Sequence, residues 1–260
     1  EPITANVMDA ATNLKLISRV GIGLDSVDLL AARERGIKVS YTPDAPAPSV
    51  AELTICLMLC LLRSVHISNS EMHSGKWHRF FGRRLAEVTL GIIGVGRIGT
   101  RVLNRTISFG TPKILVNDLK PNRELDRRFK LEWASKEKIF QEADVISLHL
   151  PLTHLTKDMI RREHLLSMKK DAVIINTSRG GIINEQDLYN VMQSGHLSGA
   201  AVDVFDSEPM GMKHPLILSE RTTITPHIGY VTQETYEVFF EDTLECVLSY
   251  INGTLVRLIN

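Results

Sequence analysis

The 260-residue chain lacks several features that would place it in a specialised class of protein. It has no excess charge, because 30 Lys and Arg residues balance 30 Asp and Glu residues, so no general field attracts nucleic acid or an anionic membrane. Its longest apolar run, Leu53 to Leu62, is far shorter than the roughly 20 residues of a membrane span. Its first four residues, EPIT, resemble no signal peptide. We therefore expect neither a nucleic-acid nor a membrane partner.

Cysteine is also scarce, with only Cys56, Cys60 and Cys246 in the chain. An odd number without paired spacing argues against a secreted disulfide framework and predicts a reducing, cytoplasmic compartment. Cys56 and Cys60 lie one helical turn apart in an apolar segment, where we expect buried thiols. We expect no metal site, since three nearby histidines do not share one helical face: His66, His73 and His78.

The first 50 residues predict a small α/β segment. Leu16–Val20 and Ile37–Tyr41 have the composition of strands, with a short helix ending at Gly36 between them. Three prolines then follow within six residues, and we expect a loop there: Pro43, Pro46 and Pro48. Ser49 and Glu52 have the spacing of a capping box, which predicts that the next helix begins after Ser49.

From Val88 onward the chain alternates between apolar runs and segments of helical spacing. The candidate strands are Leu90–Gly94, Lys113–Asp118, Val145–Leu150, Ala172–Thr177, Ala200–Phe205 and Thr222–Thr225, and examples of the helical segments are Arg97–Phe109 and Glu185–Ser194. Continuous apolar strands are typical of a parallel sheet that is covered on both faces. We therefore predict a doubly wound Rossmann domain over residues 51–231. Residues 1–50 and 232–260 are each too short to fold alone, and the latter segment begins with a long amphipathic helix, Gln233–Tyr250. We predict that both form one smaller domain.

A glycine-rich turn predicts a dinucleotide site. Gly94, Gly96 and Gly99 form G-x-G-x-x-G directly after an apolar strand, and a helical pattern begins within the motif. Asp118 ends the next strand about 20 residues on, where a carboxylate binds the ribose hydroxyls. Because this carboxylate would repel a 2′-phosphate, we predict NAD as the cofactor. NADP is the alternative, since two cations that follow Asp118 could compensate for this repulsion: Lys120 and Arg123.

Three segments at predicted strand ends contain residues suited to hydride transfer beside a carboxylate. They are residues 176–181, 203–209 and 225–229, and they contribute Arg179, Glu208 and His227. A histidine exchanges the hydroxyl proton, a neighbouring carboxylate favours its charged form, and an arginine binds the substrate carboxylate. Asp206 is the alternative neighbour of the histidine, and we favour Glu208.

These motifs together resemble the D-isomer-specific 2-hydroxyacid dehydrogenases, which include phosphoglycerate dehydrogenase, glycerate dehydrogenase and hydroxypyruvate reductase. The resemblance covers the whole chain, from residues 20–25 and 49–52 through the glycine turn to residues 226–229. It implies that Arg179, Glu208 and His227 are catalytic and that Ile22 and Gly23 bind substrate together with Arg179 and His227. It also implies a set of NAD contacts: Gly94, Gly96, Arg97, Ile98, Gly99, Asp118, His149, Pro151, Thr156, Thr177, Ser178, Asp203, His227 and Gly229.

The resemblance also implies a fold and an assembly. The smaller domain is expected to be flavodoxin-like, with a further segment before Glu1, and the enzyme to be a cytoplasmic homodimer of the phosphoglycerate dehydrogenase type. The expected subunit contacts are Leu53–Leu62 and the surroundings of Trp77. Closure of two domains about a hinge would exclude water from the site. Residues 44–48 depart from the family pattern and leave the choice of 2-hydroxy acid open. The alternatives are an NAD(H)-sensing corepressor and an enzyme acting on formate or phosphite.

Overall fold

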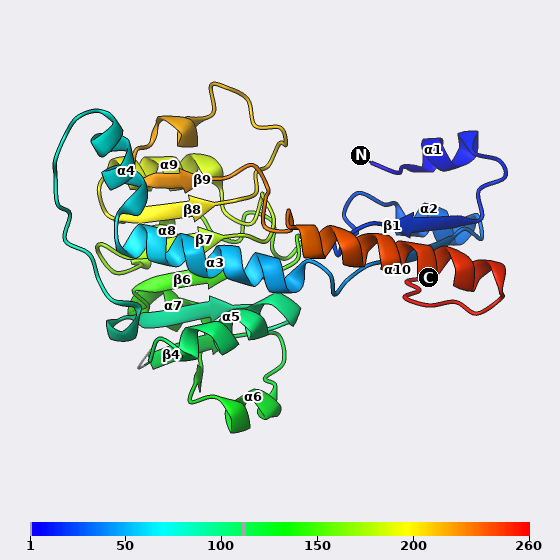
Figure 1. The fold of residues 1–260 in the computed structure, drawn as a ribbon, viewed down its shortest axis with the longest axis horizontal. Helices are drawn as coiled ribbons and strands as arrows, with labels where there is room; N and C mark the ends of the chain where they lie inside the picture. Colours follow the sequence, from blue (N-terminus) through cyan, green and yellow to red (C-terminus); the bar gives the residue numbers. More distant parts are fainter. Residues whose placement is uncertain (1, 111–112) are drawn as a thin grey trace. The chain divides into compact units, whose positions relative to one another are not determined.

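The chain divides into two compact units in the computed structural model, which describes residues 2–110 and 113–260 (Figure 1). Unit 1 combines Glu1–Ser49 with Tyr230–Asn260, and unit 2 comprises Val50–Gly229. Both ends of the chain therefore belong to one unit, and the longer unit is inserted between them. These divisions lie within two residues of the expected boundaries.

Unit 1 is built on two parallel strands, β1 (Leu16–Arg19) and β2 (Lys38–Tyr41). Its helices are α1 (Ala5–Ala10), α2 (Leu29–Glu34) and α10 (Gln233–Ile251). The core of the unit is apolar and includes Met8, Ile17, Val27, Ala32 and Val39. The last residue, Asn260, joins this sheet through its side chain, which accepts from Val39 N at 2.8 Å and donates to Ile37 O at 2.8 Å.

Unit 2 contains a parallel sheet in which the described residues form seven strands in the order β5-β4-β3-β6-β7-β8-β9. The strands are β3 (Thr89–Ile93), β4 (Lys113–Asn117), β5 (Glu132–Trp133), β6 (Val145–Leu148), β7 (Val173–Asn176), β8 (Gly199–Val202) and β9 (Thr222–Ile224). The chain runs outward from β3 to β5 and then returns to the other side of β3. Strand order therefore reverses between β3 and β6, which is where ligands bind in such sheets.

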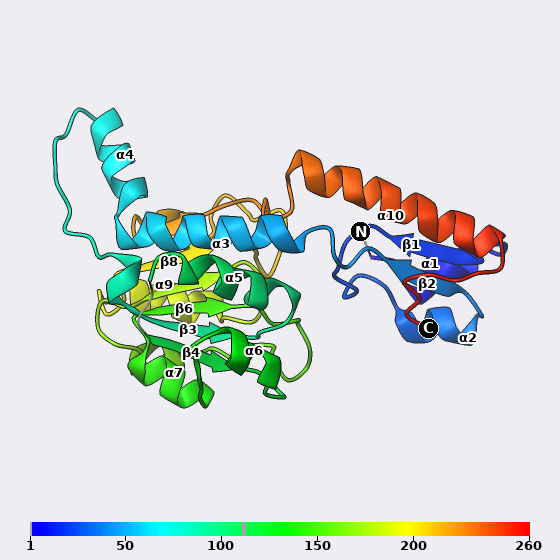
Figure 2. The ribbon, with the colours of Figure 1, turned by 60° about the horizontal axis from the view of Figure 1, so that its bottom comes forward.

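Helices cover both faces of this sheet, as the apolar strands predicted (Figure 2). One apolar cluster joins the sheet to α3 (Ala47–Leu62), α5 (Arg97–Ile107) and α6 (Arg123–Arg128). A second cluster joins the other face to α7 (Lys136–Glu142), α8 (Arg162–Ser167) and α9 (Glu185–Gln193). Neighbouring residues of the central strands enter opposite clusters: Ile92 belongs to the cluster that contains α3 and α5, whereas Ile93 belongs to the cluster that contains α7. The predicted doubly wound fold is confirmed.

Two local predictions were wrong. Helix α3 begins at Ala47, not after Ser49, because Pro48 lies in the first turn, where a missing N–H is tolerated. The Ser49 hydroxyl bonds Thr232 and Thr235 at 2.9 and 2.8 Å instead of capping the helix. Strand β5 was also missed, since its two residues form no apolar run.

Several side chains around the α3–α4 junction also differ from expectation. Helix α4 spans Val65–His73, and Cys56 of α3 is exposed, not buried. His66 is partly buried, with its Nδ1 3.7 Å from Cys60 Sγ, and burial lowers the pKa of its imidazole. No group of His, Cys, Asp or Glu in the described residues could hold a metal ion.

No single helix among the described residues has the length and apolar composition to cross a membrane. Helices α3 and α4 pass that test only as a pair, by length and composition alone, and a bend of 66° separates them.

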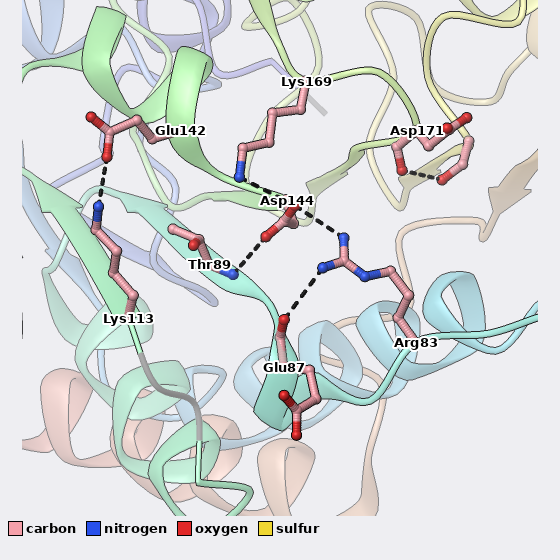
Figure 3. A network of polar contacts seen from close by, with 9 residues as sticks. Arg83, Glu87, Thr89, Lys113, Glu142, Asp144, Lys169 and Asp171 are labelled. Atoms are coloured by element: carbon pink, nitrogen blue, oxygen red, sulfur yellow. Dashed lines mark hydrogen bonds and ion pairs between the residues drawn. The ribbon is translucent and has the colours of Figure 1, made fainter.

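An ion-pair network lies at the amino ends of the parallel strands (Figure 3). The Asp144 carboxylate accepts from Arg83 Nη1 at 3.0 Å, from Lys169 Nζ at 3.4 Å and from Thr89 N at 2.8 Å. Burial by itself raises the pKa of Asp144, but the Arg83 and Thr89 hydrogen bonds and the two cations outweigh it. The pKa of Asp144 therefore lies below its usual range. This network fastens Arg83 and the segment before β6 to the start of β3.

We predict that Asp144→Ala lowers the free energy of unfolding at pH 7 by about 1–3 kcal/mol, since a largely buried charged acceptor with three donors is lost. A carboxyl group with a depressed pKa stabilises above its unfolded value of about 3.9, and this contribution disappears as pH falls through the folded pKa. The difference between variant and wild type should shrink in urea titrations below that pH. Glu142→Ala, which removes the exposed ion pairs with Lys113 and Lys138, should have a smaller effect at pH 7. An equal loss in both variants would contradict this prediction.

Candidate functional site

The glycine turn follows β3 and packs against the segment that follows β6. A Cβ at Gly94, whose φ is +94°, would lie 2.2 Å from His149 O, and a Cβ at Gly99 would lie 2.0 Å from Gly94 O. Both positions therefore exclude any side chain. This close packing sets the start of α5 directly against the carboxyl ends of β3 and β6.

Gly96 differs from its two neighbours because a Cβ there would meet nothing within 4 Å. It caps the N-terminus of α5, an end that favours anions. Across the turn, the Asp118 carboxylate accepts from Val95 N at 2.8 Å and from Leu119 N at 2.7 Å. Open space before a helix N-terminus, beside a fixed carboxylate, fits the pyrophosphate and ribose of a dinucleotide.

His149 lies beneath this turn as a neutral side chain. Its Nε2 is 2.9 Å from Ser147 Oγ, and its Nδ1 is buried without a hydrogen-bond partner. Burial lowers the pKa of His149 to about 3, so the imidazole is uncharged near neutral pH. Its predicted contact with cofactor stays a prediction.

The other predicted cofactor residues occupy three segments around the same sheet edge. Arg97 and Ile98 begin α5. Pro151 and Thr156 lie in the loop after β6, where Thr156 Oγ1 donates to Pro151 O at 2.6 Å. Thr177 and Ser178 follow β7 and are buried, and their hydroxyls bond Thr54 Oγ1 and Asn176 Oδ1, each at 2.8 Å. Their contacts with NAD remain predictions.

His227 and Glu208 form a hydrogen-bonded pair. His227 Nδ1 lies 2.7 Å from Glu208 Oε2, and the two side chains are 34% and 37% exposed. Because an ionised carboxylate only accepts, Nδ1 carries the proton of this bond, and Nε2 is the nitrogen suited to proton exchange. The second oxygen of Glu208 accepts from Phe205 N at 2.9 Å. Glu208, and not the alternative Asp206, is therefore the partner of His227.

A buried aspartate holds the loop that presents His227. Asp203 accepts from Thr225 Oγ1 at 2.5 Å and from the amides of Ile228 and Gly229, each at 2.9 Å. Burial raises the pKa of Asp203 despite these hydrogen bonds. His227 has φ +55°, a left-handed conformation that a non-glycine residue keeps only where its surroundings impose it. The three bonds to Asp203 flank this residue and supply that constraint.

Arg179 belongs to a turn that the sequence predictions described incompletely. Asn176, which had no predicted role, donates to Arg179 O at 2.8 Å and accepts from Ser178 N at 3.1 Å. A Cβ at Gly180 would lie 2.1 Å from the Phe205 backbone, so the Arg179 turn lies directly against the segment leading to Glu208. One sequence signal could have identified Asn176: it is a polar residue at the end of an otherwise apolar strand.

The predicted substrate loop lies in unit 1. Ile22 and Gly23 follow β1, and the preceding Gly21, with φ +120°, donates from its N to Thr42 Oγ1 at 2.7 Å. This bond ties the loop after β1 to the end of β2. The substrate contacts of Ile22 and Gly23 stay predictions.

Comparison with known proteins identifies the family of this chain. The family described as D-isomer specific 2-hydroxyacid dehydrogenase, NAD binding domain, matches residues 55–229. A hydroxypyruvate reductase of Thermotoga maritima is 42% identical over 236 residues, covering 89% of this chain and 76% of that enzyme. A D-3-phosphoglycerate dehydrogenase of Methanocaldococcus jannaschii is 38% identical over 98% of this chain, which spans 49% of that enzyme's length.

A solved structure shows the same fold in complex with ligands. The D-lactate dehydrogenase of Aquifex aeolicus, complexed with NAD and lactic acid, has a TM-score of 0.88 and 32% identity, covering 96% of this chain and 80% of that enzyme. The chain belongs to the D-isomer specific 2-hydroxyacid dehydrogenase family, and its unit 2 is an NAD-binding Rossmann domain.

The contrasting surroundings of Gly96 and Gly99 generate a prediction. Gly96→Ala should leave the melting temperature unchanged but weaken NADH affinity by at least about 10-fold, since a methyl group would occupy the space that the pyrophosphate approaches. Gly99→Ala should lower both, because its methyl group overlaps Gly94 O. Thermal unfolding and NADH fluorescence titration measure the two effects. Wild-type affinity in Gly96→Ala would refute this assignment.

Proposed function

We propose that the protein catalyses the NAD-dependent interconversion of a small 2-oxo acid and the corresponding D-2-hydroxy acid. The observation that carries the proposal is the His227–Glu208 pair, at 2.7 Å, on the loops that follow β8 and β9 of the same parallel sheet that bears the glycine turn. Family membership supports it, since the relatives named above include a hydroxypyruvate reductase and a D-3-phosphoglycerate dehydrogenase.

The protein's own groups move the proton. When bound, NADH supplies the hydride that reduces the carbonyl carbon. His227 donates the proton on Nε2 to the carbonyl oxygen and becomes neutral; in the oxidative direction it takes that proton from the hydroxyl group. Glu208 accepts the hydrogen bond from Nδ1 in both states, which keeps Nε2 as the exchanging atom and stabilises the imidazolium.

Arg179 is proposed to bind the substrate carboxylate. A guanidinium offers a planar pair of donors that matches a carboxylate and polarises the neighbouring carbonyl group. Its Nη1 donates to Ser178 O at 2.7 Å, and its main chain is held by Asn176. The amides of Ile22 and Gly23 are proposed to complete carboxylate binding from unit 1.

The proposed substrate class is narrowed by the relatives. Hydroxypyruvate is our first candidate, since the hydroxypyruvate reductase of T. maritima is 42% identical. Glyoxylate and phosphohydroxypyruvate are the further candidates, the latter corresponding to the phosphoglycerate dehydrogenase type that the sequence suggested. NADH is proposed as the preferred form of cofactor, because Asp118 would repel the 2′-phosphate of NADPH.

The activity has a direct test. Wild-type protein, NADH and each of the three 2-oxo acids should give a decrease in absorbance from NADH oxidation. His227→Ala should lower kcat by about 10²–10⁴-fold, since the proton donor is lost, while NADH affinity stays close to that of wild type. Gly96→Ala should show the reverse pattern: NADH affinity should fall more than kcat. Absence of turnover by the wild type with all three acids would overturn the proposed function.

We further propose that the protein is a homodimer whose subunits meet through the segment from α4 to residue 84. None of the residues of α4 is buried, Trp77 is 72% exposed, and Phe81 is fully exposed. Exposed aromatic residues in one continuous segment are typical of a protein–protein interface. The expected contact Leu53–Leu62 is not part of this surface, because most of its apolar side chains are buried in the core of unit 2: Ile55, Leu57, Met58, Leu61 and Leu62.

The dimer proposal predicts that Phe81→Glu yields monomers, because a buried carboxylate at the interface would lose its hydration without a partner. Light scattering after size-exclusion chromatography measures the mass. Phe109→Glu, at another exposed aromatic residue of unit 2, should leave the mass unchanged. A wild-type monomer at micromolar concentration would rule the proposal out.

A further inference from the structure

Glu185 lies outside the proposed catalytic residues but bonds two segments behind them. It is the first residue of α9, and its carboxylate is 14% exposed. Oε1 accepts from Asp206 N at 2.9 Å, and Oε2 lies 2.8 Å from His214 Nε2. One carboxylate thus connects the start of α9 with both ends of the loop that contains Glu208.

The bonds of His214 define its tautomer. Leu216 N donates to His214 Nδ1 at 3.3 Å, and His214 caps the short helix η2 (Pro215–Leu218) in this way. An amide can only donate, so Nδ1 is the unprotonated nitrogen and Nε2 carries the proton. His214 therefore donates from Nε2 to Glu185. Its side chain is 17% exposed, so water competes little for this bond.

The bridge leads to the catalytic pair through adjacent residues. Asp206 N bonds Glu185, and the preceding amide, Phe205 N, bonds Glu208 Oε1 at 2.9 Å. Glu208 Oε2 then bonds His227 Nδ1 at 2.7 Å. Displacement of residues 205–206 would therefore move the amide that orients Glu208.

Acidic side chains gather around the loop that this bridge holds. Burial, then the carboxylates of Glu185 and Asp158, raise the pKa of Asp206, so three acidic groups lie close enough to interact. Like charges at this spacing repel one another. The N–H donors of Asp206 and His214 compensate for this repulsion by holding Glu185 against the loop.

We propose that Glu185 and His214 are positioning residues for the reaction: they hold residues 205–214 so that Glu208 orients His227. The inference rests on the proposed function for its kinetic consequences. Among the described residues, the side chains of Glu185 and His214 bond Asp206 N, Leu216 N and each other. Their loss should therefore lower kcat and leave NADH binding close to wild type, since neither residue is among the predicted NAD contacts.

The experiment compares variants in the full-length chain. Glu185→Ala removes both bonds, Glu185→Gln keeps an acceptor for Asp206 N, and His214→Asn keeps a side-chain cap for η2 but is too short to reach Glu185. We expect Glu185→Ala to lower kcat by about 10–100-fold with the NADH KM within about 2-fold of wild type. Glu185→Gln should recover part of the loss. Asp187→Ala is the matched control, since it removes a carboxylate from the same turn of α9. In the described residues the Asp187 carboxylate accepts from Arg162 N at 3.0 Å and bonds neither Asp206 N nor His214.

Two further measurements separate positioning from general destabilisation. In a Glu208→Gln background, Glu185→Ala should reduce kcat by less than about 3-fold further, because both changes act through one group. Amide hydrogen exchange should accelerate at Phe205 in Glu185→Ala and His214→Asn, and not in Asp187→Ala.

The outcomes distinguish the two proposals. An unchanged kcat, multiplicative effects with Glu208→Gln, or unchanged exchange at Phe205 in Glu185→Ala would overturn the positioning role. Wild-type protein without turnover of any 2-oxo acid would overturn the proposed function instead. Exchange at Phe205 needs no activity, so it would still decide whether the bridge orients the Glu208 loop.

Discussion

The parallel direction of the strands in unit 2 is the constraint on which the rest of the site depends. Every described strand of this sheet has its carboxyl end on the same edge, so the segments after β3, β6, β7, β8 and β9 emerge together. Helices on both faces remove strand surfaces from water and leave that edge for ligands. At the amino ends of the strands, the Asp144 carboxylate accepts hydrogen bonds from Arg83 and Thr89, and these bonds connect neighbouring segments (Figure 3).

Close approach of backbones then converts neighbouring segments into one site. Gly94 and Gly99 allow the cofactor turn to contact the segment after β6, and Gly180 allows the Arg179 turn to contact the Glu208 segment. Carboxylates complete the arrangement by accepting from main-chain amides. Asp203 holds the His227 loop, and Glu185 holds the loop of Glu208. Rigid elements supply the frame, and these short polar contacts set the directions of the reacting side chains.

Much of this architecture follows from local sequence. Apolar runs predicted six of the seven strands described in unit 2, helical spacing predicted α5, α9 and α10 to within two residues, and G-x-G-x-x-G with Asp118 located the dinucleotide site. Errors arose where a signal was short or ambiguous. Strand β5 has only two residues, and Ser49 has the pattern of a helix cap, yet its hydroxyl bonds Thr232 and Thr235. Nothing in the neighbouring residues distinguishes these two uses of a serine.

Sequence alone determined the fold class, the cofactor motif and the residue types of the proposed catalytic set, because these depend on periodicity and on adjacent residues. Only the tertiary structure decided that Glu208 rather than Asp206 bonds His227 and that His149 is uncharged, with its Nδ1 buried. It also joined Glu185 to His214, 29 residues away in sequence. The physical reason is that hydrogen-bond partners and burial depend on how distant segments pack, which no local pattern encodes.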